Sequence, residues 1–244
     1  MAAVAALHGV GLSFGADTIV SGVDLVIVPG EFVSVVGPSG AGKSTLLRLL
    51  AGLLSPGAGT VTPATTSDPA RRAYGLVFQD ARLLPWRRVL SNVELGLEGL
   101  TVRAADRRRR ASKALAMVGL GEMEQRWPHQ LSGGQRQRVG LARAFAVEPE
   151  LLLMDEPFGA LDAITRVALQ DDLVALWQGS GRAVLFVTHD IDEAVLLADR
   201  VLVLGGKPAG IVGSVMPPAR PRDRGDAALQ EAGRMVRQLL QDLP

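Results

Sequence analysis

The segment "GPSGAGKS", Gly37 to Ser44, constrains the fold of this 244-residue chain more than any other stretch. It follows the apolar run "FVSVV" and precedes "TLLRLLAGLL", in which leucines recur with helical spacing. A strand, a glycine-rich turn and a helix in this order surround a phosphate group with backbone N–H groups and the positive end of a helix. The pattern therefore predicts a phosphate-binding loop, with a glycine-rich turn carrying an exposed lysine as the weaker alternative.

Two other apolar runs, "LLLMD" at 151–155 and "AVLFV" at 183–187, suit strands of a parallel sheet that helices cover on both faces. Helical spacing follows the second of them, and the run "VLVLG" comes next. This alternation predicts an α/β core whose ligands bind at the carboxyl ends of the strands. The N-terminal residues alternate like antiparallel strands, whereas Gln79 to Glu148 show mostly helical periodicity.

We therefore expect an α/β chain with an N-terminal antiparallel β subdomain and an inserted α-helical subdomain. The expected parts are an antiparallel and phosphate-loop part (1–77), a helical subdomain (78–148), a second part of the core (149–205) and a short C-terminal tail (206–244). The tail contains one amphipathic helical pattern and is too short for a separate domain of ordinary size.

The composition excludes several classes of protein. Basic and acidic residues nearly balance, 26 against 25, which argues against nucleic acid as the main partner. Cysteine is absent, so the chain has neither disulfides nor thiolate metal sites. No window approaches the roughly 18 consecutive apolar residues that a membrane-spanning helix needs, so a role at a membrane would depend on a partner.

Polar residues at the expected strand ends predict ATP chemistry. Lys43 can reach the β- and γ-phosphates, and the Ser44 hydroxyl can bind Mg²⁺. Asp155 ends a buried run and can bind the same ion directly or through water, while Glu156 can polarise the attacking water. Two acids merely ending a strand are the alternative, which the phosphate loop makes weak.

Two further candidates are less specific. His189 ends "LFVTH", so we expect it at the same edge of the sheet, in contact with the γ-phosphate; a packed or capping histidine is the bland alternative. Gln79 stands where the core meets the helical region. Its amide can bind Mg²⁺ or the attacking water, or it can simply begin a helix, and the residues alone leave both open.

A second anion-binding pattern, "LSGGQ", lies far along the chain from the first. Ser132 offers a hydroxyl, Gly133 and Gly134 expose backbone N–H groups, and a helix follows whose positive end faces outward. One ATP site does not account for it.

Taken together, "GPSGAGKST", "LSGGQ", "LLLMDEP", "ALD" and "TH" in this order resemble the ATPase subunits of ABC transporters, from about Ala3 to Gly205. The resemblance implies a P-loop NTPase core of RecA-like fold that uses ATP and Mg²⁺. It also implies that two copies pair head to tail, so that "LSGGQ" of one closes over the nucleotide of the other.

The resemblance also implies roles for individual residues. Phe14 would stack on adenine, Gln79 would be the lid glutamine, and Asp162 would communicate across the dimer. Where the family commonly has serine, this chain has Gly159. The catalytic set is Glu156, His189 and Gln79; the metal set is Ser44, Gln79 and Asp155; the nucleotide set is Phe14, Gly37, Pro38, Ser39, Gly40, Ala41, Gly42, Lys43, Ser44, Thr45, Ser132, Gly133, Gly134, Gln135 and Asp162.

The segment "FQDARLLPWRRVLSNVELGL" is similar to that of bacterial importers of small anions, and most similar to that of aliphatic sulfonate importers. It implies permease subunits that dock near Leu83 to Asn92, a solute-binding protein outside the cell membrane, and a peripheral place on the cytoplasmic face of that membrane. Taurine, nitrate or another small anion is the alternative solute. A soluble ABC ATPase of the repair or translation type is less consistent, because the chain has no long coiled-coil insertion and no second ATPase cassette.

Overall fold

The computed structural model describes residues 2–243, which form two compact units. The first comprises the chain up to Ala64, Leu153–Asp155 and the chain from Ala183 on. The second comprises Thr65–Leu152 and Glu156–Arg182. The boundary crosses one strand, β6 (Leu151–Asp155), so the two units share it.

The first unit begins with a three-stranded antiparallel sheet, in which β1 (Ala5–Phe14) lies between β2 (Asp17–Ile27) and β4 (Ala58–Thr62). Phe14 pairs with Asp17 across the turn that joins β1 to β2. The alternation predicted for the N-terminal residues is therefore present as an antiparallel sheet.

The core sheet of the first unit is mostly parallel. Its buried strand β3 (Phe32–Val36) lies between β7 (Ala183–Val187) and β8 (Arg200–Gly205), parallel to both. At one edge, β9 (Gly210–Val215) pairs with β8 in the antiparallel direction. Every residue of β3 and β7 is buried, as expected for strands covered on both faces. The predicted α/β class is confirmed.

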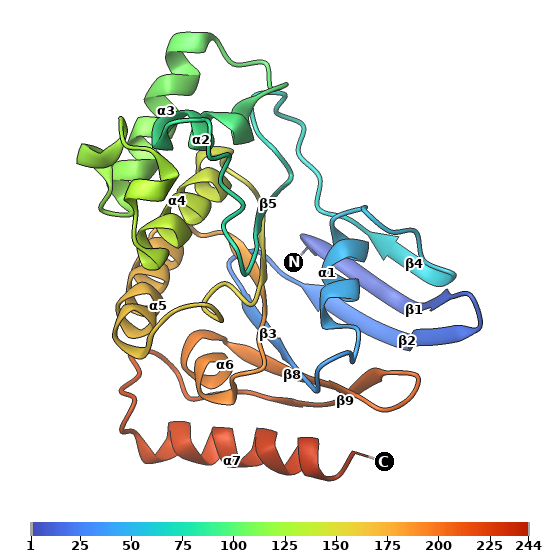
Figure 1. Ribbon diagram of the computed structural model, residues 1–244. Coiled ribbons are helices and arrows are strands. Elements are labelled where there is room, and N and C mark those ends of the chain that lie inside the picture. Colours follow the sequence, from blue (N-terminus) through green and yellow to red (C-terminus); the bar gives the residue numbers. More distant parts are fainter. Residues whose placement is uncertain (1, 244) are drawn as a thin grey trace. The chain divides into compact units, whose positions relative to one another are not determined.

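The described part of the first unit contains three helices: α1 (Lys43–Leu50), α6 (Ile191–Leu197) and α7 (Ala227–Gln241). The loop between β3 and α1 is the predicted phosphate-binding segment. Helix α7 lies along β8 and β9 (Figure 1), and its Leu229, Ala232 and Val236 are buried there.

The second unit is mainly helical. Besides the start of β6 and short 3₁₀ turns, it contains the short strand β5 (Tyr74–Val77). Its helices are α2 (Val89–Glu94), α3 (Ala104–Met117), α4 (Gly133–Ala146) and α5 (Ala163–Gln178). Helix α4 contacts α2, α3, α5 and β5, so it is the centre of this unit (Figure 1). Within residues 2–243, no helix has both the length and the apolar character needed to cross a membrane.

Candidate nucleotide-binding site

The loop from Gly37 to Gly42 depends on its glycines for two different reasons. Gly40 and Gly42 have φ of 81° and 84°, a left-handed conformation that side chains disfavour. At Gly37 a Cβ would lie 2.3 Å from the carbonyl oxygen of Leu204, which leaves no room for a side chain. The loop is therefore held in a tight form against β8 before α1 begins.

Lys43, the first residue of α1, is only 6% exposed. Its Nζ donates hydrogen bonds to the carbonyl oxygens of Gly37 and Pro38, both at 2.9 Å. The ammonium group thus lies over the loop, and a buried charge in this position must be satisfied by oxygen atoms. Phosphate oxygens could replace these two carbonyls at little cost in solvation.

Ser44 and Asp155 come together next to this loop. The Ser44 Oγ donates to the Asp155 Oδ1 at 2.9 Å, and Asp155 is the last residue of β6. Among the described residues, no cluster of three or more His, Cys, Asp or Glu side chains could hold a metal ion unaided. A hydroxyl and one carboxylate nevertheless suit Mg²⁺, which takes its remaining ligands from substrate phosphates and water.

A depression of about 1070 Å³ adjoins the phosphate loop in the first unit. Its walls come from Asp17 to Ile19 of β2, from Pro38 to Ala41 of the loop and from the residues after β8. Phe14 ends β1 one turn away from that wall and is 52% exposed. An exposed aromatic ring beside a concave surface of this size is suited to stacking on a flat ring.

His189 follows β7 and is exposed; it belongs to the first unit. Glu156 follows β6 and belongs to the second. Glu156 has φ of 46°, in the left-handed region, which is uncommon for a residue other than glycine. Strain of this kind is concentrated at functional positions.

Gln79 lies beside the turn that follows Glu156 in the second unit. A Cβ on Gly159 would be 3.0 Å from the Gln79 Nε2, and the Gly159 N–H donates to the Glu156 carbonyl at 3.1 Å. Gln79 itself is exposed and does not lie within a helix. A serine at position 159 would require the Gln79 amide to shift by a few tenths of an ångström.

The "LSGGQ" segment forms the N-terminus of α4. Ser132 is the N-cap: its Oγ accepts from the Gln135 N–H at 3.2 Å, and the Gln135 Oε1 accepts from the Ser132 N–H at 3.0 Å. This capping box satisfies two of the free N–H groups of the helix end. The Gln135 side chain is therefore used within the helix, while the Ser132 hydroxyl proton remains available to a ligand.

The two glycines of this segment differ. A Cβ on Gly133 would have only Leu161 within 4 Å, at 3.9 Å, whereas a Cβ on Gly134 would be 2.3 Å from the Thr165 Cγ2 of α5. Gly133 is exposed and Gly134 is buried. Gly134 thus permits the close packing of α4 on α5, and Gly133 leaves the backbone open.

Asp162 is the N-cap of α5, where its Oδ1 accepts from the Thr165 N–H at 3.0 Å. Hydrogen bonds from Thr165 lower the pKa of this exposed carboxyl. Asp162 therefore carries its charge at neutral pH.

One residue of this region was not anticipated from the sequence. Gln137 is 3% exposed, and its Nε2 donates to the carbonyl oxygen of Phe78 at 2.8 Å. It therefore ties the first turns of α4 to the residue before Gln79. Gln137 comes two residues after "GGQ", and only its burial in the structure distinguishes it from an ordinary polar residue of a helix.

The segment Leu83 to Asn92 carries Trp86, which is 70% exposed. A groove of about 600 Å³ lies in the same unit. It is lined by Phe78 and Arg82 before this segment, by Leu95 after it and by Arg143 of α4, whereas Trp86 is not among its lining residues. The Arg82 guanidinium lies over the Phe78 ring, 4.4 Å from its centroid. Arg143 is partly buried, and this burial lowers the pKa of its guanidinium. Aromatic and arginine side chains around an apolar groove are typical of protein interfaces.

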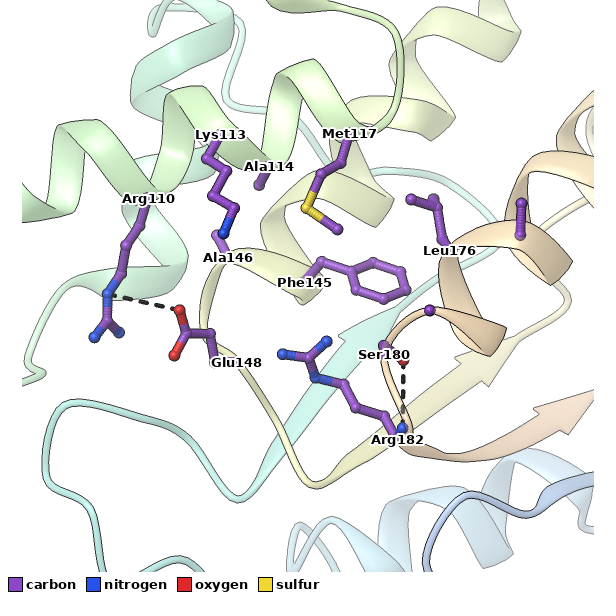
Figure 2. A pocket seen from close by; sticks show the side chains of 12 residues that line it. Arg110, Lys113, Ala114, Met117, Phe145, Ala146, Glu148, Leu176, Ser180 and Arg182 are labelled. Atoms are coloured by element: carbon purple, nitrogen blue, oxygen red, sulfur yellow. Dashed lines mark hydrogen bonds and ion pairs between the residues drawn. The ribbon is translucent and has the colours of Figure 1, made fainter.

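A smaller hollow of about 420 Å³ lies between α3 and the carboxyl ends of α4 and α5. Figure 2 shows Lys113 and Arg182 directed into it beside the Phe145 ring. The arginines are bonded to backbone carbonyls: Arg110 NH1 to that of Ala70 at 2.6 Å, and Arg182 Nε to that of Pro149 at 2.9 Å. Cations at this place complement the negative ends of two helices, so we assign this hollow a structural role.

Comparison with known proteins agrees with this geometry. Residues 20–159 match the ABC transporter family. The aliphatic sulfonates import ATP-binding protein SsuB 2 of Pseudomonas aeruginosa is 50% identical over 225 residues, 92% of this chain and 80% of that protein. The protein of that name, SsuB, in Escherichia coli is 50% identical over 226 residues, 92% of this chain and 86% of its own length.

Two solved structures resemble the chain over 88% of its length and 100% of their own, and both are 33% identical to it. One is a dimeric bacterial ABC transporter cassette, with a TM-score of 0.74. The other is a dimeric post-hydrolysis cassette bound to ADP and Pi, with a TM-score of 0.72. The chain therefore belongs to the ABC transporter family, as an ATP-binding ATPase whose hydrolysis is coupled to transport.

Proposed function

We propose that this chain is the ATP-hydrolysing subunit of an importer of aliphatic sulfonates. The contact between Ser44 and Asp155 beside the phosphate loop carries the chemical part of the proposal. The choice of aliphatic sulfonates as the solute rests on the names of relatives that are about half identical over most of both chains.

In the bound state, Lys43 exchanges its two carbonyl partners for the β- and γ-phosphates of ATP, and the loop N–H groups hold the remaining oxygens. Ser44 and Asp155 would hold Mg²⁺, which would offset negative charge on the phosphates. Phe14 stacks on the adenine. These roles need no large change in the loop, because its glycines already hold it in a tight form.

Hydrolysis needs a water in line with the γ-phosphate. Glu156 takes a proton from that water, and Gln79 and His189 orient the water and the phosphate. The left-handed backbone at Glu156 is the kind of strain found at functional positions, which supports this assignment.

A second copy of the chain completes the site. Ser132 and Gly133 are exposed at the positive end of α4, an arrangement suited to binding an anion. The phosphate loop belongs to the other unit of the chain. In a head-to-tail dimer each copy offers this end to the ATP of the other, and Asp162 lies at the contact between the copies. Two-fold symmetry then gives two shared sites.

The membrane partner docks on the second unit. The exposed Trp86 and the groove lined by Phe78, Arg82 and Leu95 offer an aromatic anchor and a concave surface to a cytoplasmic helix of the permease subunits. The chain would then lie at the cytoplasmic face of the bacterial membrane. A solute-binding protein outside the membrane delivers the sulfonate to the permease, and the ATPase itself does not touch the solute.

The proposal is tested by ATPase stimulation in a reconstituted complex. The chain is combined in lipid with its permease and solute-binding protein, and alkanesulfonates, taurine and nitrate are added one at a time. We expect alkanesulfonates to stimulate hydrolysis. Stimulation by nitrate or taurine alone would leave the motor in place but give it another solute, and failure to form a complex would contradict the transport role.

A further inference from the structure

Asn92 is one of the few polar residues that are completely buried, with 0% exposure. It lies in α2, and its amide faces back toward the chain before the helix. The Oδ1 accepts from the Leu84 N–H at 2.7 Å, and the Nδ2 donates to the carbonyl oxygens of Leu84, Arg87 and Arg88 at 3.1, 2.9 and 3.2 Å. One amide therefore holds both ends of the segment from Leu84 to Arg88.

That segment is a tight turn with Trp86 at its tip. The Arg87 N–H donates to the Leu84 carbonyl at 3.1 Å, and Pro85 occupies the second position, where its fixed φ favours a turn. The indole is 70% exposed, so contacts of its own ring do not hold the turn in shape. The conformation that presents Trp86 depends on the amide beneath it.

The far side of the turn is fixed as well. The N–H groups of Val89 and Leu90 donate to the carbonyls of Arg126 and Glu124, at 2.9 and 3.0 Å. The Arg88 guanidinium lies 5.1 Å from the Trp127 ring centroid and donates to the Gln125 carbonyl. The start of α2 therefore has a rigid base. Within the described residues, the turn between Leu84 and Arg87 is ordered by the buried Asn92, by its own hydrogen bond and by an ion pair of the Arg87 NH1 with the Glu98 Oε1 at 2.6 Å. That ion pair is partly exposed to solvent, so it contributes less than the buried amide.

We propose that Asn92 is a positioning residue for docking: it pre-forms the turn that presents Trp86 to an apolar cytoplasmic helix of the permease. The proposal rests on the docking surface assigned above. An anchor that is already ordered loses less conformational entropy on binding, so more of the contact energy of the indole appears as affinity. A central aromatic anchor is where interface energy is concentrated.

The chemistry at position 92 allows few substitutes. An aspartate keeps the acceptor oxygen. Its second carboxylate oxygen replaces the Nδ2 donor, however, and repels the three carbonyl oxygens that the Nδ2 bonds. A leucine has a similar size but leaves the Leu84 N–H and the carbonyls unsatisfied in a buried place. Glutamine keeps both functions on a longer arm, so it is the variant in which partial rescue is expected.

The test compares Asn92→Asp, Asn92→Gln and Trp86→Ala, singly and combined. Affinity for the permease in lipid nanodiscs is measured by biolayer interferometry, with active protein counted by ATP binding. Gln170→Glu is the matched control, because it makes the same change at another buried amide of the same unit, on α5. Fluorine NMR of 5-fluorotryptophan-labelled protein follows Trp86 in the free subunit.

We expect Asn92→Asp to weaken docking about tenfold or more, the effect of one unmade buried hydrogen bond. Asn92→Gln should recover part of the loss, and Gln170→Glu should lower stability without changing docking per active molecule. In the Trp86→Ala background, Asn92→Asp should add nothing, and the Trp86 fluorine signal should move or broaden in Asn92→Asp alone.

Two results would overturn the inference: docking of Asn92→Asp equal to that of Gln170→Glu, or an equal loss from Asn92→Asp with and without Trp86. Normal docking of Trp86→Ala is a different result, because it would contradict the assignment of the docking surface itself. If Asn92→Asp does not fold, the comparison of Asn92→Gln with and without Trp86 decides the same question.

Discussion

The Ser44 hydroxyl donates a 2.9 Å hydrogen bond to the carboxylate of Asp155, a residue 111 positions away. The contact joins the first turn of α1 to the end of β6, at the edge where the parallel strands end. The hydroxyl and the carboxylate are thus next to each other before any ion binds. An ion that takes both as ligands replaces one hydrogen bond and requires no movement of the backbone.

This relationship predicts the effect of Asp155→Asn. The amide keeps the hydrogen bond to Ser44 but loses the charge that holds a divalent cation. We expect nucleotide affinity without Mg²⁺ to stay within about twofold, and the gain on adding Mg²⁺ to fall about tenfold or more, as for loss of a charge-assisted contact. Isothermal titration with ATP, with and without Mg²⁺, measures both. An unchanged gain would show that Asp155 is no ligand.

Lys43→Ala should abolish tight nucleotide binding. The variant removes the cation over the loop, and a charge-assisted contact to a phosphate contributes about 1.5–3 kcal/mol, or roughly 10- to 150-fold in affinity. The Gly37 and Pro38 carbonyls that Lys43 now satisfies can be hydrated through the open loop. Lys43→Arg tests geometry separately from charge, because the planar guanidinium cannot occupy the narrow space that the lysine ammonium fills. Equal ATP affinity in Lys43→Ala and the parent would contradict the assigned role.

Glu156→Gln should still bind ATP and should accumulate as a dimer, while hydrolysis falls by about 10²- to 10⁴-fold, the usual effect of losing a general base. Glu148→Gln is the matched control, since Glu148 also has a left-handed φ, of 49°, and lies in the same unit. Light scattering in saturating MgATP and a phosphate-release assay are the two measurements. A monomer in Glu156→Gln, or equal hydrolysis in both variants, would remove Glu156 from its role.

Much of the fold could be predicted because its signals are local. The buried runs, the glycines and the helical spacing around Lys43 act within a few residues, and the edge where parallel strands end brings Ser44 and Asp155 together by topology alone. The antiparallel N-terminal strands follow from alternation in the same way. These features depend on period and order, which a sequence states directly.

What could not be predicted depends on packing between elements distant in the chain. The burial of Asn92 under its own turn, and that of Gln137 against the Phe78 carbonyl, need the positions of backbone groups 8 and 59 residues away. Both residues read as ordinary helix polar residues in the sequence. The proximity of the Gln79 amide to Gly159 likewise depends on the turn after β6 and not on sequence spacing.

The two glycines of the "LSGGQ" segment separate a structural role from a functional one. Gly134→Ala should lower the free energy of unfolding by about 1–3 kcal/mol, because its Cβ would lie 2.3 Å from the Thr165 Cγ2, so that the Thr165 side chain must leave its rotamer or α4 must move away from α5. Gly133→Ala meets only Leu161, at 3.9 Å, so stability should change by less than about 1 kcal/mol. Urea unfolding of the isolated subunit measures both values.

Hydrolysis should show a different order from stability. In Gly133→Ala the new methyl group stands at the exposed N-terminus of α4, where the nucleotide of the second copy is expected, so ATPase activity of the dimer should fall although the subunit is intact. Mixing Gly133→Ala with Lys43→Ala gives a direct check, because each variant damages a different half of a shared site. Since one site of such a mixed dimer carries both defects and the other carries neither, activity should return in the mixture. No recovery on mixing would argue that each chain hydrolyses ATP alone, and equal loss of stability in the two glycine variants would contradict the distinction between them.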